Sequence, residues 1–99
     1  MKITIQSIHF DADKKLQQFI EEKCNKLPHY FESILEATVY LKVEKNAQAE
    51  NKTVEIKLAV PSNTLMASQH AKTFEEGTDM CIEQLKRQLV KHKEKLRSM

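Results

Sequence analysis

Residues 53–70, TVEIKLAVPSNTLMASQH, contain the pattern that decides the fold. Over 53–60 every second residue is a large apolar one, and the residues between them are Thr, Glu, Lys and Ala. This alternation predicts a strand with one buried face, because successive side chains of a strand point to opposite sides. Pro61, Ser62 and Asn63 form a turn signal, so we expect a hairpin into another strand near residues 64–70.

Two more strands and a helix are predicted upstream of this hairpin. Residues 37–45, ATVYLKVEK, alternate in the same manner, and the polar segment NAQAEN connects them to the hairpin. Residues 2–10, KITIQSIHF, alternate as well and predict a first strand. Between these two strands, apolar residues at helical spacing predict a helix over 13–27, with Asp11 and Asp13 both suitable as N-caps and Pro28 ending it.

The last quarter of the chain predicts one long amphipathic helix that begins near residue 73. On a helical wheel its apolar residues share about 100° of arc, and His92 lies among them. We expect this stripe to dock on the core as far as Leu96, with His92 packed and hydrogen-bonded. The stripe consists of Phe74, Thr78, Cys81, Ile82, Leu85, Leu89, His92 and Leu96.

The order of these elements is β-α-β-β-β-α, without an internal repeat or a linker. We therefore predict an α+β two-layer sandwich, a four-stranded sheet with both helices on one face. The 99 residues suit one domain over 1–99. No run of apolar residues is long enough for a membrane span, and the alternating N-terminus does not resemble a secretion signal. Because two cysteines are also too few for a disulfide scaffold, we expect a cytoplasmic protein.

The positive charge of the chain is concentrated at its end. Residues 84–99 hold six Lys or Arg side chains and a single acid, Glu94, whereas the whole chain has a net charge of only +2. Like charges four residues apart on a helix repel by about a few tenths of a kcal/mol, so folding alone does not explain them. Two interpretations stay open, a solvated helix face and a surface for a polyanion such as RNA. A helix that touches a membrane surface is disfavoured, because the apolar stripe holds core-type residues without Trp and is needed for the core, so we expect no membrane partner. On the wheel the six cations form two rows, Lys86, Lys93 and Arg97 along one edge of the apolar stripe and Arg87, Lys91 and Lys95 on the far side.

The sequence does not show the spacing of a catalytic or metal site. The four histidines lack the arrangement of a zinc site, and Gly77 is the only glycine, so no glycine-rich phosphate loop is present. Cys24 and Cys81 fall on core-facing helical positions and are expected to be small buried apolar groups. We therefore expect no enzyme activity, cofactor, metal or small-molecule substrate. Tyr30 and Phe31 are expected to close the end of the core, although aromatic residues there can also stack on bases.

Four segments together resemble the short form of the bacterial ribosome hibernation-promoting factors, a family that includes the ribosome-associated translation inhibitor and is also called the sigma-54 modulation protein family. The segments are KLPHYF (26–31), LKVEK (41–45), Ala67-Ser68 and LKRQLVKHKEKLR (85–97). The resemblance runs along the whole chain and implies a fold like that of double-stranded RNA-binding domains. It also implies a cytoplasmic protein of stress or stationary phase. Such a protein would bind the small ribosomal subunit and its rRNA near the decoding region, and block messenger and transfer RNA.

The resemblance further implies which side chains contact ribosomal RNA. By position they are Lys23, Lys26, Lys42, Lys45, Lys86, Arg87, Lys91, Lys93, Lys95 and Arg97. Where the family has an Asp-x-Tyr-x-Ala-Ile-Asp run, this chain has TFEEGTD (73–79), in which Glu75 replaces the aromatic residue and Asp79 is retained. We expect no C-terminal dimerisation domain, and the formation of ribosome dimers stays open. Two other functions also stay open, a protein-interaction adaptor that acts on a transcription factor and a general RNA chaperone.

Overall fold

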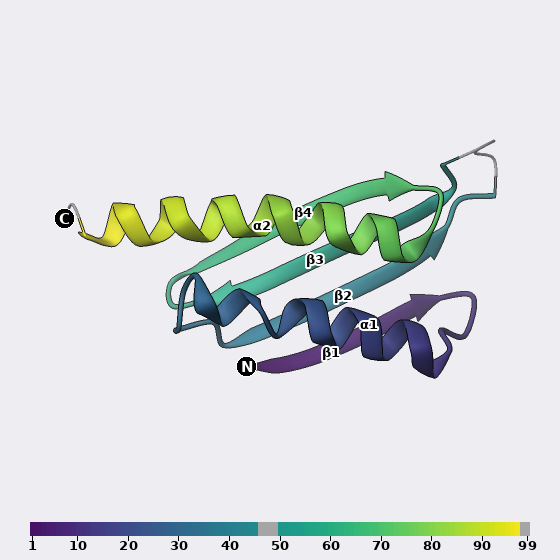
Figure 1. Ribbon diagram of the computed structural model, residues 1–99, viewed down its shortest axis with the longest axis horizontal. Coiled ribbons are helices and arrows are strands. Elements are labelled where there is room, and N and C mark those ends of the chain that lie inside the picture. The colour runs from purple at the N-terminus through teal and green to yellow at the C-terminus, as the bar shows by residue number, and fades with distance from the viewer. Residues whose placement is uncertain (46–49, 98–99) are drawn as a thin grey trace.

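The computed structural model describes residues 1–45 and 50–97, which form four strands, two long helices and one short 3₁₀ helix (Figure 1). The strands are β1 (Lys2–Ile8), β2 (Glu36–Val43), β3 (Lys52–Val60) and β4 (Asn63–Ala71). The helices are α1 (Lys14–Cys24), η1 (Leu27–His29) and α2 (Phe74–Arg97). Most of the predicted polar connection NAQAEN, at 46–49, lies outside the described residues.

The four strands form one sheet in the order β1-β2-β3-β4. β1 runs parallel to β2, which is possible because α1 crosses over between them, and the other two pairings are antiparallel. Ile56 of β3 stands opposite Val39 on one side and Ala67 on the other, so the apolar residues of neighbouring strands share one face. Both long helices lie on that face (Figure 1), and the predicted α+β two-layer sandwich is confirmed.

The β3–β4 hairpin turns inside the predicted segment 61–63, but the turn is one residue shorter than predicted because Asn63 already belongs to β4. Val60 pairs with Asn63, which leaves Pro61 and Ser62 as the two turn residues. Ser62 has a φ of 64°, and proline fixes φ near −65°, a combination that fits a type II turn. The hairpin is therefore held by backbone geometry at its tip and by buried side chains along its length.

The first half of α2 lies directly on the sheet. A Cβ atom added to Gly77 would stand 2.8 Å from Cγ2 of Val54, so only glycine allows this close approach of helix and strand. One turn later Cys81 donates a hydrogen bond from Sγ to the Val54 carbonyl oxygen, at 3.3 Å. Thr78 is fully buried and satisfies its hydroxyl by donating to the carbonyl oxygen of Phe74, at 2.7 Å. These contacts fix the position of α2 on the sheet.

α1 begins where the sequence predicts but ends earlier. Asp13 is the N-cap, and its side chain accepts a hydrogen bond from the backbone N–H of Leu16, at 2.8 Å. The predicted helix over 13–27 was too long, because α1 ends at Cys24 and the chain continues as η1. Pro28 lies inside η1; its missing N–H and its restriction of the preceding residue disfavour a further α-helical turn.

The second half of α2 extends past the end of the sheet (Figure 1). The last residues of the helix that hold it to the sheet are Leu89, which is fully buried, and Gln88, whose side chain donates to the Met66 carbonyl oxygen at 2.9 Å. Leu96 is 52% exposed, so the prediction that it docks on the core was wrong. At about 1.5 Å per residue α2 is about 36 Å long, while the sheet supplies a surface for only its first part.

His92 lies at the point where α2 leaves the sheet. Its ring packs edge-on against Phe31, with 5.1 Å between the ring centroids, so Phe31 closes this end of the core as predicted. The prediction that His92 is hydrogen-bonded was wrong for one ring nitrogen, because its Nε2 atom is buried and has no hydrogen-bond partner among the residues described. His92 is therefore positioned by its packing against Phe31 and not by a hydrogen bond to Nε2.

Candidate nucleic-acid interface

Two neighbouring hollows lie between the end of α1, η1 and α2, and Tyr30 borders both of them. We call them together the helix groove. The hollow toward the C-terminus has a volume of about 260 Å³ and the other about 410 Å³. The first is lined by His29, Tyr30, Val90, Lys93, Glu94 and Arg97, and the second by Lys23, Lys26, Tyr30, Asp79, Ile82, Glu83 and Lys86.

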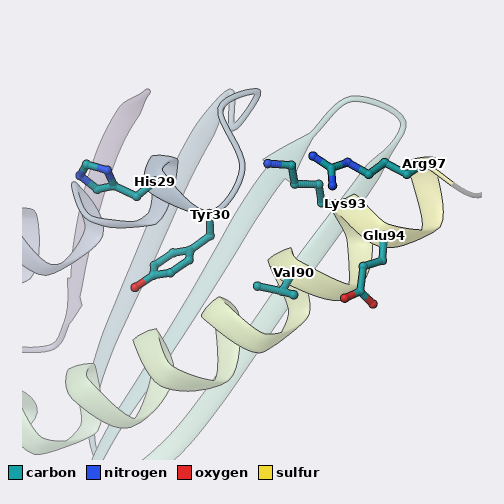
Figure 2. Close-up of a pocket in the computed structure, with 6 residues that line it drawn as sticks. All are labelled: His29, Tyr30, Val90, Lys93, Glu94 and Arg97. Carbon is teal, nitrogen blue, oxygen red and sulfur yellow. The ribbon is translucent and has the colours of Figure 1, made fainter.

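The rim of the first hollow is positively charged. Figure 2 shows Lys93 and Arg97 reaching from α2 toward the side of η1, with their charged ends near each other. Glu94 extends from another side of the helix and its carboxylate points away from those two side chains (Figure 2). Lys93 and Arg97, four residues apart on an exposed part of the helix, therefore face the same side. This arrangement suits the phosphates of a nucleic-acid backbone.

Two cations of the second hollow, Lys23 and Lys86, make weak contacts with neighbouring side chains of the protein. Lys23 forms an ion pair with Asp79, with 3.4 Å between Nζ and Oδ1, and its Nζ lies 5.2 Å from the centre of the Phe19 ring. The Nζ of Lys86 lies 5.2 Å from the centre of the Tyr30 ring. A solvent-exposed ion pair contributes only about 0–1 kcal/mol, so a phosphate group competes readily with such partners.

The second predicted row of cations lies on the opposite side of α2. Arg87 is exposed, and its Nε atom donates to the carbonyl oxygen of Glu83 at 3.4 Å. Lys91 and Lys95 border a further hollow of about 230 Å³ beside the β3–β4 turn. The projecting end of α2 therefore carries cations toward the helix groove and also away from it.

The structure places the remaining two predicted residues elsewhere. Lys42 lies near the end of β2, borders a hollow with Tyr40 and Lys57 on the sheet face that the helices leave open, and pairs with Glu44 at 3.6 Å. Lys45 follows β2 and is exposed. This end of the sheet is opposite to the end from which α2 projects (Figure 1). The helix groove therefore joins five of the predicted cations, Lys23, Lys26, Lys86, Lys93 and Arg97.

The acids of the TFEEGTD segment are also kept apart from the first hollow. Glu75 and Glu76 are exposed in the first turn of α2, where acidic side chains suit the positive end of the helix dipole. Asp79 borders only the second hollow, where it pairs with Lys23. The departure from the family pattern consequently places negative charge at the start of α2 and leaves the projecting end basic.

The two cysteines are both buried, one on each long helix. Burial raises the pKa of the Cys24 thiol to about 12, with a smaller contribution from Glu21. Burial likewise raises the pKa of Cys81 to about 12, with smaller contributions from Cys24 and Glu55. Both thiols therefore stay protonated near neutral pH and act as packed apolar groups, as the sequence predicts.

Two further properties follow from the part of the chain that the structure describes. Over residues 1–45 and 50–97 no group of His, Cys, Asp or Glu side chains is arranged to hold a metal ion. Neither long helix in these ranges is apolar enough over a sufficient length to cross a membrane.

Two features were not predicted from the sequence. They are the hollow that Tyr40, Lys42 and Lys57 border on the open face of the sheet, and the position of Tyr30 beside both hollows of the helix groove. Tyr40 and Lys57 stand out from the open side of the sheet, where Nζ of Lys57 lies 5.5 Å from the centre of the Tyr40 ring. Strand alternation assigns both to the polar face but does not tell that they meet. Tyr30 follows a helix stop, a position whose direction depends on the turn made by η1.

The fold and the groove define a small α+β domain whose projecting helix and inter-helix groove are suited to a polyanion. The chain belongs to the family described as Sigma 54 modulation protein / S30EA ribosomal protein, which it matches over residues 3–97.

Relatives of known name cover nearly the whole chain. A ribosome hibernation promoting factor from Escherichia coli strain K12 is 33% identical over 97 residues, covering 98% of this chain and 98% of the relative. A protein of the same name from Pseudomonas putida is 30% identical over 99 residues, covering 100% of this chain and 93% of the relative.

Solved structures share the fold at lower identity. A ribosomal subunit interface protein from Coxiella burnetii superimposes with a TM-score of 0.84 at 20% identity, covering 94% of this chain and 98% of that one. The N-terminal domain of Thermus thermophilus Protein Y gives 0.79 at 18% identity, covering 93% and 99%. These likenesses support the architecture.

Proposed function

We propose that this protein is a cytoplasmic ribosome hibernation factor that binds the small ribosomal subunit through its rRNA, near the decoding region. The observation that carries the proposal is the basic end of α2, which projects beyond the sheet and shares a cationic groove with η1. Membership of the family, whose curated relatives are named ribosome hibernation promoting factors, supports the choice of the ribosome as partner.

The proposed mechanism is steric and involves no covalent chemistry. Cations of α2 and of the end of α1 neutralise phosphates, which positions the domain on RNA without reading its sequence. The body of the protein measures 46 × 24 × 18 Å, and its rigid sheet would then occupy the space that messenger and transfer RNA need. Translation would stop because the site is filled, and the idle ribosome would be preserved.

Sedimentation with purified ribosomes over a series of salt concentrations tests this function. If about four to six phosphates are contacted, the slope of log K against log salt concentration should be about −3 to −5. Competition with messenger RNA and initiator transfer RNA for the small subunit should accompany the binding. No co-sedimentation at low salt, or binding that is insensitive to salt, would contradict the proposal.

A charge-reversal variant tests whether the projecting helix carries the binding. Replacing Arg87, Lys91 and Lys95 together by Glu should abolish co-sedimentation and leave the circular dichroism spectrum unchanged, because all three are exposed. The matched control reverses Lys14 and Lys15, which are exposed at the start of α1, at the far end of the molecule. Binding that survives the triple reversal would show that this row is only a solvated face.

Sucrose gradients of the same mixtures address ribosome dimers and the rival function. A shift of single ribosomes into a heavier peak would assign dimer formation to this chain, whereas an unchanged profile with bound protein would assign inactivation of single ribosomes. A protein-interaction adaptor would instead bind a protein partner in a salt-tolerant manner and would not migrate with ribosomes. A general RNA chaperone would bind free RNA and intact subunits equally well.

A further inference from the structure

Tyr30 packs against the core, as the sequence predicts, and its half-buried side chain also borders the helix groove. It borders the hollow of about 260 Å³ with Lys93 and Arg97, and also the hollow of about 410 Å³ with Lys23 and Lys26. An aromatic ring therefore borders two groups of cations, and Figure 2 shows it with the first of them, Lys93 and Arg97. A surface that only needed to attract phosphates would require no such ring, since neutralising phosphates is the work of the cations alone.

Tyr30 is positioned by its backbone and by a neighbouring side chain. Its backbone N–H donates to the carbonyl oxygen of Leu27 at 3.0 Å, which closes the 3₁₀ turn. Leu27 is fully buried and Pro28 restricts the turn, so the direction in which the side chain leaves the backbone is fixed. The Nζ of Lys86 lies 5.2 Å from the ring centre, which gives the ring a cationic neighbour.

The size of the hollows limits what can lie beside the ring. Pockets for drug-sized ligands begin at about 300 Å³, and the two hollows lie on either side of that value. This is room for one planar base on the ring and for its neighbouring phosphates among the cations. A continuous duplex keeps its bases stacked on each other, so none of them is available to the half-buried ring of Tyr30.

We propose that Tyr30 is a stacking platform for one unpaired RNA base, whose flanking phosphates are held by Lys93 and Arg97 on one side and by Lys23 and Lys26 on the other. This inference rests on the proposed function and adds the class of RNA to it: a single strand, a bulge or a loop with a base turned outward. An acidic peptide would use the cations but would gain little from the ring, so the combination of ring and cations favours RNA.

A matched pair of short oligonucleotides tests the platform directly on the native protein. One is a six-nucleotide single strand with a central 2-aminopurine, and the other carries an abasic site at that position. Stacking of a base on an aromatic side chain contributes about 1–3 kcal/mol, so the base-bearing strand should bind about 5- to 150-fold more tightly. Its fluorescence should be quenched on binding, as expected for a stacked base.

Two substitutions separate the ring from the rest of the side chain. Tyr30→Phe keeps the ring and should retain both the quenching and the preference for the base-bearing strand. Tyr30→Leu keeps an apolar group against the core and should bind the two strands equally without quenching. Circular dichroism confirms that each variant is folded, and the comparison of the two strands on the native chain does not depend on either variant.

Several outcomes would overturn the platform. They are equal binding of the two strands by the native protein, absence of binding to either at low salt, and unchanged quenching in Tyr30→Leu. Displacement of the RNA by polyglutamate in a manner that depends on Tyr30 would assign the groove to an acidic protein and overturn it too. Ribosome sedimentation tests the proposed function independently of the platform. If the protein binds ribosomes in a salt-dependent manner but binds the two oligonucleotides equally well, the stacking platform is rejected and the proposed function still stands.

Discussion

The two halves of α2 differ in almost every physical respect although they belong to one continuous helix. Residues 74–89 contain all of its buried side chains and lie on the sheet, whereas residues 90–97 project beyond it. Acids gather in the first half and cations in the second. The comparison shows that one helix separates buried packing from exposed charge along its length: the first half is restrained by packing, and the second presents charged side chains to solvent.

Burial explains why the halves diverge. A side chain such as Leu85, which is fully buried, contributes about 1.5–3 kcal/mol by leaving water. Lys95 and Arg97 lie in the last turn of the helix, where its dipole stabilises each by about 0.3–1 kcal/mol. The projecting half is therefore stable enough to remain helical while it contributes little to the core.

Truncation of one leucine in each half should give the largest contrast. Leu85→Ala removes a fully buried side chain and should lower the free energy of unfolding by about 2–5 kcal/mol. Leu96→Ala removes a side chain that is 52% exposed and should change it by less than about 0.5 kcal/mol. Urea denaturation measures both. Similar losses from the two variants would mean that the projecting half is packed in solution.

A larger side chain at Gly77 should break the contact between the first half and the sheet. The added Cβ would already stand 2.8 Å from Cγ2 of Val54, so Gly77→Leu should destabilise the protein by about 2–3 kcal/mol despite the better helix propensity of leucine. Thermal unfolding measures the loss. The matched variant Val90→Leu, on the exposed half, should unfold near the native temperature; a stable Gly77→Leu variant would contradict the close approach.

Alkaline pH should weaken the first half through its buried thiol and that of α1. Burial raises the pKa of Cys24 and of Cys81 from 9.0 to about 12, so above pH 9 the unfolded chain loses these protons and the folded chain keeps them. Stability should therefore fall as pH rises between 9 and 12, by about 1.4 kcal/mol per thiol at pH 10.

The double variant Cys24→Ala, Cys81→Ala isolates this effect. It should be less stable than the native protein at pH 7 because it leaves cavities, but its stability should depend less on pH above 9. Urea denaturation of both proteins at pH 7, 9 and 10 gives the comparison. Parallel pH profiles would show that the thiols are not shielded from water as their burial indicates.

Neutralising a cation in the second half should have the smallest effect on folding. Lys91 follows Arg87 by one turn, so Lys91→Gln should relieve repulsion and stabilise the protein by about 0.2–0.5 kcal/mol. The same change should weaken ribosome binding and reduce the magnitude of the salt slope by about one. Lys14→Gln at the start of α1 serves as the control and should leave binding unchanged. A lower free energy of unfolding for Lys91→Gln, together with unchanged ribosome binding, would mean that Lys91 supports the fold and does not take part in binding.

Much of the fold could be predicted because its signals are local. Strand alternation in 53–60 and the turn signal at 61–63 predict the central hairpin, which the structure contains. Asp13 caps α1 as predicted. The errors concern ends: α1 stops at Cys24, and the apolar stripe of α2 outlasts the sheet, so Leu96 is exposed. A wheel describes the face of a helix but contains no information about how far its neighbour extends.

The helical wheel separates the six cations of α2 into two rows, but only the structure shows that one of these rows shares a groove with Lys23 and Lys26. Lys93 and Arg97 meet near Tyr30 because η1 turns the chain back toward α2. Lys42 belongs to the same predicted set but lies on the open face of the sheet, near the opposite end. Sequence spacing orders residues within one element, whereas the distance between elements depends on packing.

By itself the sequence determined the types of the elements, their order, the buried stripe and the concentration of charge at the end of the chain, because each depends on residues within a few turns of one another. The tertiary structure decided where α2 leaves the sheet, which cations share a groove and where Tyr30 stands among them. These depend on how α1, η1 and α2 pack over a sheet of limited length, a property of long-range contacts that periodicity does not describe.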